Sequence, residues 1–174
     1  RHGKILSIYK SDFQHMQCSM NDAEMTSPLK TPSDTTSNAV CAPVLAALRQ
    51  ELGDAEVLTG EQISEKYLRD WSDERDGIPL AVVRPRNTQQ VAQVLRVCHA
   101  HGQAVTPQGG LTGLAGGAVP SQGSVVLSME RMSGITAIDT DSATLTVLAG
   151  TPLQVIQEAA QQAGFFYALD LGSR

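Results

Sequence analysis

Glycine is concentrated in one segment of this 174-residue chain, Pro107 to Pro120, which we name the glycine-rich loop. Five glycines fall within nine residues of it: Gly109, Gly110, Gly113, Gly116 and Gly117. Glycine reaches positive φ without steric cost and lets another group approach the backbone closely. Successive backbone N–H groups in such a loop can form a concave nest that binds an anion. The loop is therefore the candidate site for a diphosphate.

The residues of the loop exclude two familiar phosphate sites. It contains no GxGxxG opening a helix, as a dinucleotide Rossmann turn would, and no Lys lies between Pro107 and Arg131, as a P-loop would require. Binding would rest on backbone N–H groups and the Thr112 hydroxyl, which suits a permanently held cofactor better than a triphosphate. Apolar residues such as Leu111 and Leu114 favour an ordered loop over a flexible linker.

A strand, a helix and a second strand precede the loop in the predicted structure. The apolar run 80–83 predicts a buried strand, Asn87 with Gln90 predicts a helix start, and Gly102 ends that helix. Residues 104–106 form the second strand. This order is typical of a βαβ unit, so we expect the two strands to be parallel.

Further elements are predicted on both sides of this unit, and no internal repeat is visible, so the fold class is α+β. They are helices over 44–52 and 59–68, a strand over 124–128, a hairpin of 135–139 and 144–149 turning at 140–142, and a helix with Thr151 as N-cap that ends at Gly164.

The first residues differ in character from the rest. Residues 1 to about 40 show no sustained period and are rich in Ser, Thr and Pro in their second half, which predicts a disordered or non-native tail. Residues 41–79 then form an N-terminal helical lead-in. Because the sequence begins at Arg1 rather than Met, we expect its first residue not to be a native start.

Composition excludes several classes of partner. A net charge of −5 argues against nucleic acid and anionic membrane surfaces. No run approaches the about 20 apolar residues of a transmembrane segment. Three cysteines without CxxC spacing are typical of free thiols in a reducing compartment, so we expect a cytoplasmic protein.

Other candidate residues have simpler interpretations. His99 and His101 are spaced i, i+2 on a helix and do not face one another, so no metal site is predicted. Trp71 is interpreted as a packing residue. The acidic run is interpreted as a solvated loop; it comprises Asp70, Asp73, Glu74 and Asp76.

Five stretches in register resemble a known family. They are PQGGLTGLAGG in the loop, AVVRPRNTQQVAQVLRVCHAHG before it, YLRDWS at 67–72, VVLSMERM at 125–132 and ALDLGSR at 168–174. Together they are similar to the FAD-binding (PCMH-type) domain of the vanillyl-alcohol oxidase superfamily, in its D-lactate, glycolate and D-2-hydroxyglutarate dehydrogenase branch. The resemblance covers about residues 64–174. It implies that 80–174 are the first half of such a domain, incomplete at the C-terminus.

The resemblance also implies cofactor-binding residues. In the family this loop wraps the FAD pyrophosphate, and a second loop beginning at LDLG approaches the flavin. By position, the residues assigned to FAD are Gln108, Gly109, Gly110, Leu111, Thr112, Gly113, Gly116, Gly117 and Asp170. Members that attach FAD covalently have His where Thr112 falls, so non-covalent FAD is expected.

The implied function is the FAD-binding part of a flavin-dependent D-2-hydroxy acid dehydrogenase. Its partners would be a small 2-hydroxy acid substrate and an electron acceptor. In related enzymes the catalytic and metal-binding residues lie far downstream, so we expect none before Arg174 and an inactive fragment. Two alternatives remain: a non-catalytic flavin- or nucleotide-binding module, and an incomplete translation product without activity.

Overall fold

The computed structural model describes residues 7–9, 37–72 and 74–170. Three 3₁₀ turns lie between α1 and β3: η1 (Asp54–Glu56), η2 (Gly60–Gln62) and η3 (Glu65–Tyr67). The helices and strands are, in chain order, β1 (Ser7–Tyr9), α1 (Ser37–Leu52), β2 (Val57–Leu58), β3 (Ala81–Val83), α2 (Thr88–Ala100), β4 (Val105–Gln108), β5 (Val125–Ser128), β6 (Ile135–Asp139), β7 (Thr144–Val147) and α3 (Leu153–Gln162). The α+β class is confirmed.

A four-stranded sheet carries the glycine-rich loop. Its strand order is β2-β3-β5-β4, with β3, β5 and β4 parallel and β2 antiparallel to β3. The predicted strand–helix–strand unit is confirmed, and β3 and β4 do run parallel. They are not neighbours, however, because β5 pairs between them. Every residue of β5 is buried, as expected for an apolar strand with a partner on each side.

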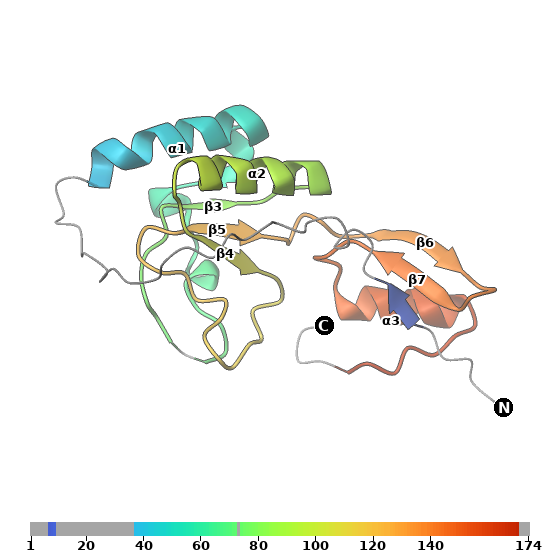
Figure 1. Cartoon of the computed structure of the whole chain (residues 1–174). Helices are drawn as coiled ribbons and strands as arrows, with labels where there is room; N and C mark the ends of the chain where they lie inside the picture. Colours follow the sequence, from blue (N-terminus) through green and yellow to red (C-terminus); the bar gives the residue numbers. More distant parts are fainter. Residues whose placement is uncertain (1–6, 10–36, 73, 171–174) are drawn as a thin grey trace, which may run out of the picture.

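Helices α1 and α2 cover one face of this sheet (Figure 1). Alternate strand residues point to opposite faces. Val83 and Leu127 pack with Leu48 of α1 and Val94 of α2. On the other face Val82 and Val126 pack against Tyr67 of η3. Two separate apolar layers therefore hold the sheet in place. The glycine-rich loop leaves the sheet at the end of β4, an edge strand.

A second, three-stranded sheet has the order β1-β7-β6 and packs with α3. The predicted hairpin is confirmed: β6 and β7 are antiparallel, and β1 runs parallel to β7. Its core consists of Leu145, Ile156, Ala160 and Phe165. This apolar cluster is distinct from those of the first sheet.

Two predicted helix starts are wrong in detail. Pro152, not Thr151, is the N-cap of α3, because the Thr151 hydroxyl donates to Leu148 O at 2.7 Å and so holds the turn before the helix. The predicted helix over 59–68 is two 3₁₀ turns, although Thr59 N does donate to Gln62 Oε1 as expected at a capping box. Both turns are too short to propagate α-helical bonds.

Most of the predicted tail lies outside the described residues, so its disorder stays a prediction. Of the residues predicted to form the tail, Ser7–Tyr9 form the strand β1, and α1 begins at Ser37 rather than after residue 40. Of the cysteines, Cys98 is a free thiol whose pKa burial raises to about 11, which makes it an unreactive core residue. Cys18 lies outside the described residues.

Candidate functional site

The glycine-rich loop begins with Pro107 and Gln108, the last two residues of β4. Because β3, β5 and β4 are parallel, their carboxyl ends lie at one edge of the sheet, and the loop leaves the sheet there after Gln108. Figure 1 shows the loop, in yellow, on the side of the sheet opposite α1 and α2. Ligands of open α/β sheets bind outside the carboxyl ends of the strands. The fold therefore places the loop where a cofactor site is expected.

The backbone of the loop offers hydrogen-bond donors that no described residue accepts. Within the described ranges, no acceptor is found for the N–H groups of residues 109–117, whereas Val119 N donates to Gly116 O at 3.0 Å and closes the turn. Gly109, Gly110, Gly113 and Gly117 are exposed. A Cβ atom built on Gly109 or Gly117 would meet nothing within 4 Å. Open space and unpaired donors fit an anionic ligand.

Two residues of the loop have left-handed backbone conformations. They are Leu111, with φ of 57°, and Gly116, with φ of 69°. Glycine adopts this region freely, whereas a leucine there costs on the order of 1–3 kcal/mol. Such strain is typical of ligand-binding turns, which adds a second reason to place the site here.

Gln108, predicted to contact FAD, is buried at the start of the loop, and its side chain binds η3 and the return of the loop. Its side chain is 2% exposed. Nε2 donates to Tyr67 O at 2.9 Å and to Ala118 O at 2.8 Å, while Oε1 is buried without a partner among the described residues. The amide therefore joins the start of the loop to its return at Ala118.

Asp70 corrects one sequence interpretation. It is 3% exposed and is not part of a solvated loop. Its Oδ1 accepts hydrogen bonds from Ser72 Oγ at 2.5 Å and Ser72 N at 2.9 Å. The Ser72 hydroxyl and N–H, together with the Ala118 N–H, hold the pKa of Asp70 below its usual value. A Cβ on Gly113 would lie 3.3 Å from Asp70 Oδ2, so the carboxylate lies against the loop.

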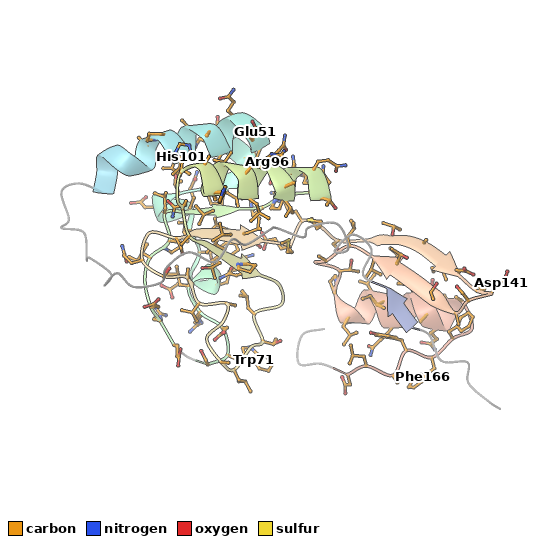
Figure 2. All side chains as sticks on the ribbon, viewed as in Figure 1. Glu51, Trp71, Arg96, His101, Asp141 and Phe166 are labelled. Carbon is orange, nitrogen blue, oxygen red and sulfur yellow. The ribbon has the colours of Figure 1, made fainter. Side chains whose placement is uncertain are left out.

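Trp71 also differs from expectation. It is 59% exposed rather than packed in the core, and Figure 2 shows it at the tip of the loops below the first sheet. Leu114, within the glycine-rich loop, is 77% exposed. The sequence pattern alone could not separate these positions from core positions, because neither belongs to a periodic apolar face.

The rest of the acidic run is exposed where it is described, as predicted; Asp73 lies outside the described residues. A cavity of about 480 Å³ is lined by Glu74, Arg75, Asp76, Gly116 and Val119. Glu74 lies so close to Gly116 that a Cβ there would meet its carboxylate. Two carboxylates around one arginine do not fit a diphosphate. Of the two halves of the loop, the first is the better candidate for an anion site.

A group of ion pairs that the sequence analysis missed lies beside the loop at the same strand ends. Glu56 Oε1 accepts from Arg86 Nε at 2.9 Å and Arg131 Nη1 at 2.5 Å. Glu130 binds Lys66 at 2.7 Å and the Tyr67 hydroxyl at 2.6 Å.

Burial disfavours ionisation of Glu130, but the hydrogen bonds from Lys66 and Tyr67 outweigh it and lower its pKa. The hydrogen bond to Glu130 raises the pKa of Lys66. The partners come from segments far apart in the sequence, so their spacing gave no signal. These pairs anchor η1 and η3 to the strand ends.

The remaining predicted residues are distributed as follows. Thr112 is half-buried in the loop, and Asp170 is exposed in the segment after α3. The cofactor role of Asp170 stays a prediction. His99 and His101 lie at the end of α2, and the described residues contain no group of three or more His, Cys, Asp or Glu able to hold a metal ion. In the same residues, no helix is long and apolar enough to cross a membrane.

Comparison with protein families identifies one match. Residues 79–174 match the family model described as FAD binding domain. The matched region begins just before β3 and contains the glycine-rich loop, so it includes all nine of the residues predicted to bind the cofactor.

Several curated proteins are similar in sequence. D-2-hydroxyglutarate dehydrogenase of Xanthomonas citri pv. viticola is 37% identical over 132 residues, which are 76% of this chain and 28% of that protein. The mitochondrial D-2-hydroxyglutarate dehydrogenase of Bos taurus is 35% identical over 75% of this chain and 24% of its own length. Glycolate oxidase subunit GlcD of Bacillus subtilis is 34% identical over 62% of this chain and 23% of its own length. The chain thus spans about a quarter of these relatives.

Solved structures show the same fold. p-Cresol methylhydroxylase with substrate bound aligns with a TM-score of 0.64 at 23% identity, over 72% of this chain and 25% of that chain. 4-Ethylphenol oxidase from Gulosibacter chungangensis, in an isoeugenol complex, aligns with a TM-score of 0.65 at 24% identity, over 77% and 27%. At this identity the likeness concerns the arrangement of elements.

Proposed function

Because this chain belongs to the family of FAD binding domains, we propose that it is the FAD-binding part of a flavin-dependent dehydrogenase of D-2-hydroxy acids. The similar proteins support this class, since they are named D-2-hydroxyglutarate dehydrogenase, putative D-lactate dehydrogenase and glycolate oxidase subunit. All three names describe oxidation of a hydroxyl group beside a carboxylate.

One observation of the structure carries the assignment of the site. The N–H groups of residues 109–117 have no acceptor within the described part of the chain and follow the carboxyl end of β4. We place the pyrophosphate of FAD on Gly109, Gly110, Leu111, Thr112 and Gly113, where the glycines are exposed and the exposed carboxylates of the cavity beside Gly116 do not line the loop. Gly116 and Gly117 form the return of the loop, and Gln108 supports its base.

Asp170 would contribute from the segment after α3. Attachment would be non-covalent, because the loop contains no His and Thr112 stands where members of the family that attach FAD covalently have one.

When bound, FAD would accept the hydride that leaves the carbon carrying the substrate hydroxyl. The residues of this chain bind and orient it. Backbone N–H groups would stabilise the charge of the diphosphate by hydrogen bonding. The buried Gln108 would keep the loop in one conformation, which lowers the entropic cost of binding. We assign no residue of this chain to proton transfer. The 2-hydroxy acid and the electron acceptor would be bound by the full-length protein.

We also propose a cytoplasmic location. The names of the relatives in Bos taurus and Arabidopsis thaliana place those proteins in mitochondria. Localisation of a tagged full-length protein would distinguish the two compartments.

The function is tested on the full-length protein that contains these residues. We expect it to purify with stoichiometric FAD that stays in the supernatant after acid precipitation, as non-covalent flavin does. We further expect it to reduce a dye acceptor with at least one of D-lactate, glycolate and D-2-hydroxyglutarate. Purified protein without flavin, and unable to take up added FAD, would contradict the proposal; flavin in the precipitate would contradict only non-covalent attachment.

A further inference from the structure

We propose that Asp70 is a positioning residue for the glycine-rich loop, an inference that rests on the proposed function because it explains how the FAD-binding donors are kept in place. Asp70 lies outside the loop, 39 residues before Gly109 in the sequence. We propose no contact between Asp70 and the substrate or the reacting atoms. It acts through the backbone of the loop.

Ser72 orients the Asp70 carboxylate. Asp70 is buried, and Oδ1 is held by the hydroxyl and the N–H of Ser72, two residues later. These two bonds fix the orientation of the carboxylate. The second oxygen, Oδ2, is buried and has no hydrogen-bond partner among the described residues. A buried charged oxygen of this kind is costly to retain unless the geometry around it serves a purpose.

The Asp70 carboxylate lies against the glycine-rich loop. Oδ2 lies 3.3 Å from the position of a Cβ on Gly113, and the Ala118 N–H is among the groups that lower the pKa of Asp70. Gln108 Nε2 donates to Ala118 O at 2.8 Å. The loop is therefore held at Ala118 by Gln108 and bounded at Gly113 by the carboxylate of Asp70. Any side chain at Gly113 would press on the carboxylate.

This support affects how the loop binds FAD. The N–H groups of residues 109–117 have no acceptor among the described residues, so few hydrogen bonds of the segment itself keep it in one conformation. Asp70 and Gln108 supply that support from outside the segment. A loop held ready binds its ligand without first being ordered, and the gain appears as affinity.

The experiment compares variants of the full-length protein, prepared without flavin and titrated with FAD. Asp70→Asn keeps the size of the side chain but places an amide donor where N–H groups face a carboxylate. We expect its Kd for FAD to rise roughly tenfold or more, as for loss of a hydrogen bond to a charged group. Ser72→Ala should raise the Kd less. The double variant should bind no more weakly than Asp70→Asn, because both changes remove one support.

Readouts other than affinity separate positioning from general stability. At saturating FAD we expect the kcat of Asp70→Asn to equal that of the wild type, and the melting temperature of its flavin-free form to stay close to the wild-type value. Hydrogen exchange in the flavin-free protein should accelerate at residues 109–118 and stay unchanged in β3 and β5. Asp141→Asn, which removes one charge at the distant hairpin turn, is the matched control and should change none of these values (Figure 2).

Two outcomes would overturn the proposal: wild-type affinity in Asp70→Asn, or faster exchange spread over the whole first sheet with a matching fall in melting temperature. Should Asp70→Asn not fold, Ser72→Ala decides by the same readouts. If the wild-type protein binds no FAD at all, the proposed function fails, while the exchange data still decide whether Asp70 holds the loop.

Discussion

Two loops of this chain each depend on an aspartate carboxylate, but the carboxylates come from different places. In the β6–β7 turn, Asp139 Oδ1 accepts hydrogen bonds from Asp141 N at 2.9 Å and Ser142 N at 3.1 Å. In the glycine-rich loop, Asp70 approaches Gly113 and Ala118 from a segment about forty residues earlier. The first turn satisfies its own backbone. In the second, the N–H groups of residues 109–117 find no acceptor among the described residues, and the loop is supported from outside.

The difference teaches how a binding loop can be both ordered and open. A turn that pairs its own donors has none left for a ligand, so it connects strands and does nothing more. A loop supported by remote side chains can keep its donors for an anion and still hold one conformation. Each loop also has one non-glycine residue with positive φ, Leu111 with 57° and Ala143 with 53°. The comparison between the glycine-rich loop and the β6–β7 turn leads to three predictions.

The largest effect is expected at Gly116. It has positive φ and lies against the Glu74 carboxylate, whereas Gly117 has open space around its Cα and no positive φ. Gly116→Asp adds strain, a steric conflict and a second negative charge, so we expect FAD retention to be abolished. Gly116→Ala should lower the stability by about 1 kcal/mol or more. Gly117→Ala, the matched control, should leave the melting temperature unchanged.

Flavin content and thermal melts of the full-length variants measure this prediction. If Gly116→Asp retained FAD at wild-type levels, the return of the loop would not belong to the site. The glycine-rich loop and the β6–β7 turn could then no longer be contrasted by function.

A smaller effect is expected from glycine at the two left-handed positions. Leu111→Gly and Ala143→Gly both relieve backbone strain, so each should change the free energy of unfolding by no more than about 1 kcal/mol, in the stabilising direction. Only Leu111→Gly should also weaken FAD binding, because it loosens the loop that must be held ready. Chemical denaturation and FAD titration of both variants provide the comparison. Equal FAD affinity in the two would show that Leu111 has no role in preorganisation.

The smallest effect concerns the acid dependence of the hairpin turn. Hydrogen bonds from Ser142 and Asp141 lower the pKa of Asp139 in the folded state. A depressed carboxyl pKa contributes stability that is present above the unfolded value and is lost as the pH falls through the folded value.

We therefore expect the melting temperature of Asp139→Asn to fall less steeply than that of the wild type below about pH 4. Asp139→Ala, which loses both hydrogen bonds, should melt lower than the wild type at every pH. Identical acid profiles for Asp139→Asn and the wild type would contradict the role of this carboxylate.

The sequence by itself determined the features that depend on neighbours a few residues apart. Asn87 Oδ1 accepts from Gln90 N at 2.9 Å and begins α2, as its spacing predicted. The apolar run of β3, the hairpin around Asp139 and the concentration of glycines after β4 were equally readable. In each case the hydrogen bond, or the lack of a side chain, lies within the segment that the pattern describes.

Only the tertiary structure decided which residues support the loop. That β5 pairs between β3 and β4, that Asp70 is buried and that Trp71 is exposed all depend on contacts between distant segments. An aspartate in a polar run has the same local sequence whether it is solvated or buried. Its burial follows from the sheet, which brings residues 67–72 against 108–118 through Gln108 and Tyr67. Local patterns carry no information about that meeting, because it is packing of the whole sheet that brings the two segments together.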